Sequence, residues 1–321
     1  MDYRDLGRAG VKVSALCLGN MNFGGSADEK VSRSIMDHAV DKGINFFDTA
    51  NVYVKSEAEK VLGRWLNDGG PNRRDKLVIA TKVYGKTGDG PNDRGLSRRH
   101  ILLACEQSLS RLKTDRIDLY QCHHWDTVAI DETIGAMDDL IRAGKVVYWG
   151  TSNFKAWQIA EATYKADAKA TAPPVSEQCP YSITNRQVEL ELAPFCMKYG
   201  VRMLPWSPLN AGRLSGVYRQ GKPIEDAPRN KSPEWRKALD KNMDTIEALA
   251  LLAESLGQGL PQLAYAFLLT QPHVASVITG PRTMEHLDEA IKAVDWRLDA
   301  DTLKKIDQIV PPGTSPDYIG W

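Results

Sequence analysis

Four residues suited to proton transfer stand at comparable places in this sequence: Asp48, Tyr53, Lys82 and His123. A tyrosine phenol has a pKa of about 10, so alone it is a poor acid or base near neutral pH. A nearby ammonium group favours the phenolate and lowers that pKa, and a carboxylate can hold the ammonium in place. An imidazole can donate a hydrogen bond to a substrate oxygen. Together these groups suit proton donation to a carbonyl oxygen.

These residues must be brought together by the elements that carry them. Asp48, Lys82 and His123 lie at or just beyond the ends of short apolar runs, and Tyr53 follows closely after Asp48. Such runs are typical of buried parallel strands. In a barrel of parallel strands the C-terminal ends converge on one face, where the connecting loops build an active site.

Strand-like and helix-like segments alternate along the chain, which predicts an α/β fold with parallel strands. The candidate strands are residues 14–18, 44–48, 77–82, 117–122, 146–151, 175–178, 202–206 and 274–278. The candidate helices are residues 29–42, 56–67, 97–112, 131–143, 155–169, 187–199, 238–256 and 284–294, with further helices at 260–270 and 299–309. This order predicts a (β/α)8 TIM barrel with extra C-terminal helices.

Two connections, 83–95 and 210–235, are longer than usual and follow strands, so we expect both to shape a substrate pocket over the catalytic face. The last nine residues carry aromatic side chains without a helical or strand period. They either fold across the pocket mouth or cap the core. No repeat or low-complexity segment divides the chain, and residues 1–321 are expected to form one domain.

The composition excludes several classes of partner. Lys plus Arg and Asp plus Glu number 41 each, so no charge excess favours nucleic acid or an anionic membrane. No apolar run approaches the roughly 20 residues of a membrane-spanning helix, and the N-terminus lacks the pattern of a signal peptide. The five cysteines form no CxxC pair and are expected to be reduced, which predicts a cytoplasmic location: Cys17, Cys105, Cys122, Cys179 and Cys196.

Lys82 would be costly at the end of an apolar strand unless a carboxylate compensates its charge, and Asp48 is the expected partner. An alternative is that the two form only a structural ion pair, which would still leave Tyr53 beside a cation. His123 and His124 are neighbours, and successive side chains on a strand point to opposite faces, so only one is expected to enter the pocket.

Many segments of this chain resemble the aldo-keto reductase family. Tyr3 to Met21 resembles its N-terminal β-hairpin and first strand, and Asp48-Thr49-Ala50 with Tyr53, Ser56-Glu57 and Leu62-Gly63 is similar to its signature after the second strand. Its cofactor-binding segments are matched by Gly150 to Phe154, Glu177 to Tyr181, Trp206 to Leu209, and Gly280 to Thr283 with Glu289. Counted from Asp118-Leu119-Tyr120, the family's imidazole falls on His123.

The resemblance implies an NADP(H)-dependent oxidoreductase that reversibly reduces aldehydes or ketones, with Tyr53 as the acid. No side chain donates hydride, so a bound nicotinamide must supply it. Trp206 would stack on the nicotinamide, Ser152, Asn153 and Gln178 would bind its carboxamide, and Ser207, Pro208, Leu209, Asn210 and Ala211 would approach the pyrophosphate. The remaining expected cofactor contacts are Gly19, Asn20, Met21, Asp48, Gly280, Arg282, Thr283, His286 and Glu289. The substrate pocket would be lined by Phe23, Tyr84, His124, Trp125 and Tyr318.

Arg282 and Thr283 open a helix, whose free N–H groups attract anions, and the planar guanidinium of arginine suits a phosphate. This favours NADPH over NADH. The sequence departs from the family pattern where Val54-Lys55 replaces a frequent Gly-x-Gly and Asn20 replaces a common threonine. His286 and Ala290 replace a frequent glutamine and asparagine near the adenine.

Two other functions compete with a reductase. A cofactor-sensing subunit like the β subunits of potassium channels would share the barrel, although the intact catalytic residues argue against it. A metal-dependent hydrolase is suggested by His123, His124 and Asp126, but no second cluster completes a metal shell, so we expect no metal site. Gly88, Gly90 and Gly95 lack the spacing of a GxGxxG fingerprint, which disfavours a doubly wound dinucleotide fold. The sequence specifies neither the substrate nor the oligomeric state.

Overall fold

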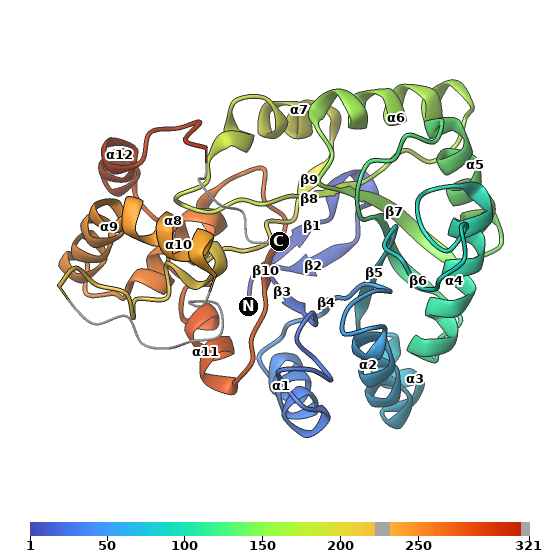
Figure 1. The fold of residues 1–321 in the computed structure, drawn as a ribbon, viewed down its shortest axis with the longest axis horizontal. Coiled ribbons are helices and arrows are strands. Elements are labelled where there is room, and N and C mark those ends of the chain that lie inside the picture. Colours follow the sequence, from blue (N-terminus) through green and yellow to red (C-terminus); the bar gives the residue numbers. More distant parts are fainter. Residues whose placement is uncertain (222–231, 316–321) are drawn as a thin grey trace.

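The computed structural model describes residues 1–221 and 232–315 of the chain (Figure 1). In this part, eight parallel strands form one sheet in the order β10-β3-β4-β5-β6-β7-β8-β9. The strands are β3 (Leu16–Gly19), β4 (Phe46–Asp48), β5 (Val78–Val83), β6 (Ile117–Cys122), β7 (Val146–Ser152), β8 (Ser176–Gln178), β9 (Arg202–Met203) and β10 (Val277–Thr279). The sheet closes on itself because Met203 bridges Val274 just before β10, with its backbone N–H donating to His273 at 2.9 Å. The predicted TIM barrel is confirmed.

The predicted strand 202–206 forms a regular ladder only over Arg202–Met203. Pro205 has no N–H to donate, which interrupts the regular strand. The pairing resumes as an isolated bridge between Pro180 and Trp206. Trp206 is therefore still held at the end of this strand.

Helices alternate with the strands and cover the outside of the barrel (Figure 1). They are α1 (Glu29–Asp41), α2 (Glu57–Asp68), α3 (Gly70–Arg74), α4 (Arg98–Leu112), α5 (Ile130–Arg142), α6 (Ala156–Ala168), α7 (Leu192–Tyr199), α8 (Pro233–Lys241), α9 (Met243–Ser255), α10 (Leu260–Thr270), α11 (Met284–Lys292) and α12 (Ala300–Ile309). Helices α8, α9, α10 and α12 gather on one side, at the left of Figure 1. Of these, α10 and α12 are the expected additional helices.

The predicted helix 238–256 is wrong, since two helices occupy this region. The backbone leaves helical geometry at Asn242, with φ −104° and ψ 8°. The side-chain amide of Asn242 donates to the carbonyl of Ala238 at 2.7 Å, which satisfies an orphan carbonyl at the end of α8. Asparagine side chains often form hydrogen bonds with nearby backbone groups, and these bonds compete with the backbone bonds that would continue a helix.

An antiparallel hairpin of β1 (Tyr3–Asp5) and β2 (Lys12–Ser14) precedes the barrel, as expected. Leu6 and Val13 of this hairpin are completely buried and pack with Cys17 and Phe46 in the inner apolar cluster. The hairpin therefore closes the barrel at the N-terminal ends of the strands.

Successive side chains along the strands point alternately into the barrel and outward to the helices, and this alternation positions the site. Phe46, Ala80, Leu119 and Leu204 point into the inner cluster, whereas their sequence neighbours pack outward against the helices. Two positions further along the same strands stand Asp48, Lys82, Gln121 and Trp206. Because side chains repeat every second residue, these four continue the inward rows at the C-terminal ends of the strands.

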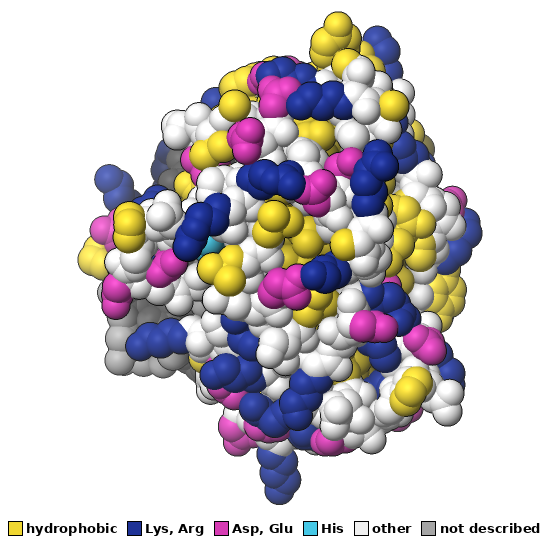
Figure 2. Space-filling view, turned by 90° about the vertical axis from the view of Figure 1, so that its right-hand side faces the viewer, with side chains coloured by type: hydrophobic (Ala, Val, Ile, Leu, Met, Phe, Trp, Pro, Cys, Tyr) yellow, Lys and Arg dark blue, Asp and Glu magenta, His cyan; other side chains and the backbone are white. Residues whose placement is uncertain are grey.

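None of the helices within residues 1–221 and 232–315 is long and apolar enough to cross a membrane. On the face shown in Figure 2, Lys and Arg side chains are interspersed with Asp and Glu, which agrees with the zero net charge.

Candidate active site

Lys82 connects three of the four residues singled out from the sequence. Its ammonium donates to Asp48 Oδ1 at 2.5 Å, to the backbone carbonyl of Thr49 at 2.9 Å and to the Tyr53 hydroxyl at 3.1 Å. Lys82 is completely buried and Asp48 is 3% exposed. An ammonium has three hydrogens, so Lys82 is fully satisfied only with the Tyr53 oxygen included.

The second carboxylate oxygen of Asp48 is held by two side-chain amides. Gln121 Nε2 donates to Oδ2 at 2.9 Å, and Gln178 Nε2 donates to the same atom at 3.0 Å. Gln178 Nε2 also donates to Gln121 Oε1 at 3.1 Å. Gln121 was not among the predicted site residues. The signal that could have found it is its place in the strand, where it is the one polar residue in the alternating row of Ile117, Leu119 and Gln121.

The pKa of Tyr53 is raised above its ordinary value of 10, because burial disfavours the phenolate more than the Lys82 charge favours it. The expectation of a lowered pKa is therefore wrong for the protein without ligand. For Lys82, burial alone would lower the pKa, but Asp48 and Tyr53 together raise it. At neutral pH the phenol is thus protonated and the amine is charged.

His123 lies edge-on to the Tyr53 ring, with 5.7 Å between ring centroids and an interplanar angle of 81°. Burial, with the charge of Lys82 and the neighbouring His124, lowers the pKa of His123 to about 2. Its imidazole is therefore neutral and carries one N–H. The His124 ring is stacked on it at 5.1 Å, so the two rings are not on opposite faces. The alternation does not apply because β6 ends at Cys122.

Asn153 joins the ends of several strands at the mouth of the barrel. Its Nδ2 donates to the carbonyl of His123 at 3.1 Å, and its Oδ1 accepts from Trp206 Nε1 at 3.2 Å. The neighbouring Ser152 hydroxyl donates to the carbonyl of Gln178 at 2.9 Å. Asn153 adopts a left-handed backbone with φ 59°, a conformation that asparagine tolerates better than most residues.

The segment expected at the pyrophosphate also has a defined backbone. The Ser207 hydroxyl accepts from the backbone N–H of Ala211 at 2.9 Å, and the Asn210 side chain donates to Thr184 at 2.7 Å. Pro208 and Leu209 lie between them. A small pocket in this region is lined by Pro180, Tyr181, Ser182, Asn185, Trp206, Ser207 and Asn210.

Buried polar atoms without partners mark where a ligand would fit. Both side-chain amide atoms of Asn20, which is completely buried, lack a hydrogen-bond partner among residues 1–221 and 232–315. The Thr49 hydroxyl and the Asn51 amide, close to Tyr53 in sequence, are in the same state within this part of the chain. A Cβ on Gly280 would meet only Asn22 Nδ2, at 3.8 Å, so its backbone is open to a ligand. These residues fit a bound nicotinamide cofactor.

The expected phosphate-binding residues Arg282 and Thr283 lie at the N-terminus of α11. Thr283 is its N-cap residue and accepts from the backbone N–H of His286 at 3.4 Å. The Arg282 guanidinium forms no ion pair within the described part of the chain, while its backbone N–H donates to His286 Nδ1 at 3.4 Å. Glu289 is already bonded to Gln262 and to Lys292.

The comparisons with known proteins agree with this geometry. The model of the aldo/keto reductase family matches residues 15–311. The chain belongs to this family.

Similar proteins include an uncharacterized oxidoreductase, YrpG, from Bacillus subtilis, which is 40% identical over 332 aligned positions and is covered completely, as is this chain. Two probable voltage-gated potassium channel β subunits are also similar. The one from Arabidopsis thaliana is 39% identical and the one from Oryza sativa is 37% identical, each with 97% of both chains covered.

The expected contacts of this aldo-keto reductase at its first strand divide into two kinds. Met21 is 47% exposed beyond the strand, where a ligand can reach it. Gly19 has a packing reason to be glycine, because a Cβ there would lie 2.8 Å from Ile278 Cγ2 and 2.9 Å from the carbonyl of Thr279. Its place in the sequence is therefore explained by the close approach of β3 and β10.

Of the expected substrate-lining residues, some lie at the barrel mouth and one is buried in the core. Tyr84 and His124 pack together at the barrel mouth, with ring centroids 5.2 Å apart. Trp125 packs against Phe154 at 5.2 Å and Trp157 at 5.4 Å. Phe23 departs from the expectation: it is completely buried in the outer core, because the turn that carries it folds back through a bridge to Ala27. Tyr318 lies outside the described residues.

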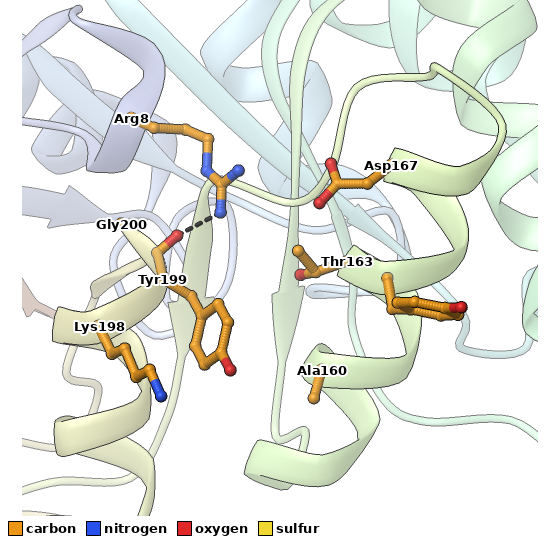
Figure 3. Close-up of a pocket in the computed structure, with 8 residues that line it drawn as sticks. Arg8, Ala160, Thr163, Asp167, Lys198, Tyr199 and Gly200 are labelled. Carbon is orange, nitrogen blue, oxygen red and sulfur yellow. Dashed lines mark hydrogen bonds between the residues drawn. The ribbon is translucent and has the colours of Figure 1, made fainter.

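A separate pocket of about 590 Å³ lies between α6 and α7 (Figure 3). It is lined by Arg8, Ala160, Thr163, Tyr164, Asp167, Lys198, Tyr199 and Gly200. None of the predicted site residues lies there, so this pocket is distinct from the candidate active site.

Proposed function

We propose that this aldo-keto reductase is an NADP(H)-dependent enzyme that reduces aldehydes or ketones to alcohols and also catalyses the reverse reaction. The observation that carries the proposal is the Tyr53 hydroxyl at 3.1 Å from an ammonium that is itself bound to a buried carboxylate. When bound, the reduced nicotinamide would supply the hydride.

Tyr53 would donate the proton to the carbonyl oxygen. Its raised pKa keeps it protonated at neutral pH, as an acid must be. The phenolate left behind would lie against the charged amine of Lys82, which stabilises it. The neutral His123 would donate its one N–H to the same oxygen and orient it. In the reverse direction the phenolate would accept the proton of the alcohol.

The cofactor would be held by residues at the ends of several strands. The donated hydrogen bonds of Gln178 Nε2 go to Asp48 and Gln121, which leaves the side-chain oxygen Oε1 of Gln178 to accept from a nicotinamide carboxamide. Ser152 and Asn153 would bind the same group, and Trp206 would stack on the ring. The guanidinium of Arg282 at the start of α11, which has no ion pair among residues 1–221 and 232–315, favours the phosphate of NADP(H).

The proposal also covers the class of substrate, the location of the protein and its domain organisation. Tyr84, His124 and Trp125 would make the substrate pocket aromatic, which suits aryl, cyclic or sugar-like carbonyls. The five cysteines are free and buried, which supports a cytoplasmic location. We also propose that residues 1–321 form one domain.

A second candidate is a cofactor-sensing subunit, favoured by the similarity to the two probable potassium channel β subunits. Such a protein would bind NADPH with little or no turnover. The Tyr53 hydroxyl, which accepts from the buried Lys82–Asp48 pair and keeps its own hydrogen free for a substrate oxygen, favours the enzyme.

A panel of aldehydes, ketones and alcohols, assayed by the absorbance of the reduced nicotinamide with NADPH and with NADH, tests the proposal. We expect saturable NADPH oxidation, and we expect Tyr53→Phe to lower kcat by about a hundredfold or more while NADPH binding persists. Tyr148→Phe is the matched control, because Tyr148 donates to the carbonyl of Ala9 at the other end of the barrel. NADPH binding without turnover of any carbonyl would support the sensing subunit, and unchanged turnover in Tyr53→Phe would refute the assigned acid.

A further inference from the structure

Glu177 is a completely buried acid that the proposed reaction does not use. It precedes Gln178 on β8, and because strand side chains alternate, it points away from the barrel interior toward the helices. Its position is therefore outside the catalytic group but directly behind the residues expected to hold the nicotinamide.

The carboxyl group of Glu177 is bonded to the segment that follows β7. Its Oε1 accepts from the backbone N–H of Phe154 at 3.0 Å, and its Oε2 lies 2.5 Å from the Thr151 hydroxyl. The Thr151 hydroxyl is also 3.2 Å from the carbonyl of Ser176. Glu177 thus contacts this segment at Thr151 and Phe154, on both sides of Ser152 and Asn153.

The hydrogen count requires a proton on Glu177 if all these contacts are to be bonds. Thr151 has one hydroxyl hydrogen and cannot donate to both Ser176 and Glu177. A protonated Glu177 donates to the Thr151 oxygen, Thr151 donates to the carbonyl of Ser176, and Oε1 still accepts from Phe154. Each of these three contacts is then a hydrogen bond.

The surroundings agree with a neutral carboxyl. Glu177 acts electrostatically on three buried thiols, those of Cys122 on β6, Cys179 just after β8 and Cys196 on α7, and burial is the main cause that raises their pKa values. No lysine or arginine compensates Glu177 within the described residues, and burial raises its pKa to about 8.

We propose that Glu177 is a positioning residue that fixes residues 152–154 and thereby holds Asn153 where the nicotinamide end of the cofactor binds. This inference rests on the proposed function. Asn153 bonds to both His123 and Trp206, so a shift of this segment would disturb the expected carboxamide site and the stacking tryptophan together.

Glu59 provides a matched control. It is also completely buried and also accepts from the hydroxyl of an outward-facing strand threonine, Thr81, at 2.6 Å. It differs in its ion pair with Arg111 of α4 at 2.6 Å and in its place on α2, which lies between β4 and β5 in sequence, whereas residues 152–154 stand at the end of β7. A substitution of Glu59 that removes its charge should therefore lower the stability of the protein without affecting residues 152–154.

The test is the Kd for NADPH, followed by quenching of tryptophan fluorescence in Glu177→Leu, Glu177→Gln and Glu59→Gln. Glu177→Leu leaves the Phe154 N–H without an acceptor, and we expect its Kd to rise about tenfold or more. Glu177→Gln keeps that acceptor and can donate to Thr151, so its Kd should stay within about threefold of the wild type. Glu59→Gln should leave the Kd unchanged. An unchanged Kd in a folded Glu177→Leu variant would overturn the proposal.

A second measurement does not depend on Glu177→Leu folding. In the wild type, ionisation of Glu177 above its pKa of about 8 removes the proton that it donates to Thr151. The single Thr151 hydrogen must then serve either Glu177 or the carbonyl of Ser176, so one bond of this segment is lost and the Kd for NADPH should rise more steeply with pH than in Glu177→Gln. Parallel pH profiles of the two proteins would overturn the proposal. A wild type that does not bind NADPH would instead refute the proposed function, so the two failures are distinguishable.

Discussion

At the scale of residues, Asp48 has two separate tasks. One carboxylate oxygen holds Lys82, and the other accepts from the amides of Gln121 and Gln178. A buried carboxylate and ammonium are expensive to remove from water, and these additional hydrogen bonds offset that cost. The amides also fix the direction of the carboxylate, and so the place of the amine beside Tyr53.

Removing Lys82 alone should be worse for stability than removing both charges. Lys82→Met leaves Asp48 buried without a counter-charge, and we expect the free energy of unfolding to fall by about 3–5 kcal/mol. The double variant Asp48→Asn/Lys82→Met should recover at least half of that loss while remaining inactive. Urea unfolding and turnover measured on the same preparations check this. A double variant less stable than Lys82→Met would contradict the account.

At the scale of elements, the turn between β4 and α2 is unusual. Val54, Lys55 and Ser56 all have left-handed backbones, with φ values of 49°, 53° and 71°. Each such residue other than glycine costs about 1–2 kcal/mol. This is the place where the sequence lacks the family's frequent glycines, and the predicted difference in the loop is a strained turn directly after Tyr53. The Ser56 hydroxyl, which donates to the carbonyl of Asn51 at 2.6 Å, helps to hold it.

Lys55→Gly should therefore be tolerated or stabilising, with Tm unchanged or raised. Glycine adopts a positive φ without steric cost, although its greater freedom in the unfolded chain offsets part of the gain. Lys60→Gly is the matched control, because Lys60 lies inside α2, where glycine should cost about 1 kcal/mol. Thermal unfolding of the two variants gives the comparison. Equal losses of Tm would show that the turn is not strained.

The start of α11 is the element that should discriminate between the two cofactors. Arg282→Met removes the guanidinium that has no ion pair in the described part of the chain. We expect KM for NADPH to rise about ten- to a hundredfold, since a charged hydrogen bond contributes about 1.5–3 kcal/mol, and KM for NADH to change little. Lys304→Met, on the exposed surface of α12, should alter neither value. Equal increases with both cofactors would contradict a phosphate site at Arg282.

At the scale of the whole molecule, barrel closure assembles the site. Asp48, Gln121 and Gln178 come from β4, β6 and β8, which are alternate strands of the sheet. Side chains from alternate strands meet in one layer inside such a barrel. Residues separated by 73 and 130 positions in sequence thus reach the same carboxylate oxygen. The hairpin closes the other end, which leaves the C-terminal face as the entrance.

The stability of the whole molecule should depend on pH through Glu177. Its pKa is raised from 4.5 to about 8, so between these values the folded chain holds a proton that the unfolded chain has released. The free energy of unfolding therefore falls as the pH rises through this range, and the contribution is complete below pH 4.5 and lost above about 8.

Urea unfolding at several pH values, with the Glu177→Gln curve subtracted, isolates this contribution. The neutral His123 and His273 have lowered pKa values of about 2 and 4, act in the opposite sense on the acid side, and cancel in the subtraction. A difference between the two proteins that does not change from pH 5 to pH 8 would show that Glu177 is already ionised.

The sequence by itself determined the order of the elements and the residues at the strand ends. Apolar periodicity is a local property, so the barrel and the C-terminal helices could be predicted, and the motifs supplied the family and its hairpin. The end of α8 at Asn242 could not be predicted, because a single side-chain hydrogen bond to Ala238 decides it.

Only the tertiary structure decided what surrounds those residues. The role of Gln121, the upward direction of the Tyr53 pKa and the grip of Glu177 on residues 152–154 all depend on burial and on contacts between strands far apart in sequence. The physical reason is that desolvation and long-range hydrogen bonds are set by the closed barrel, and no local pattern of residues encodes either.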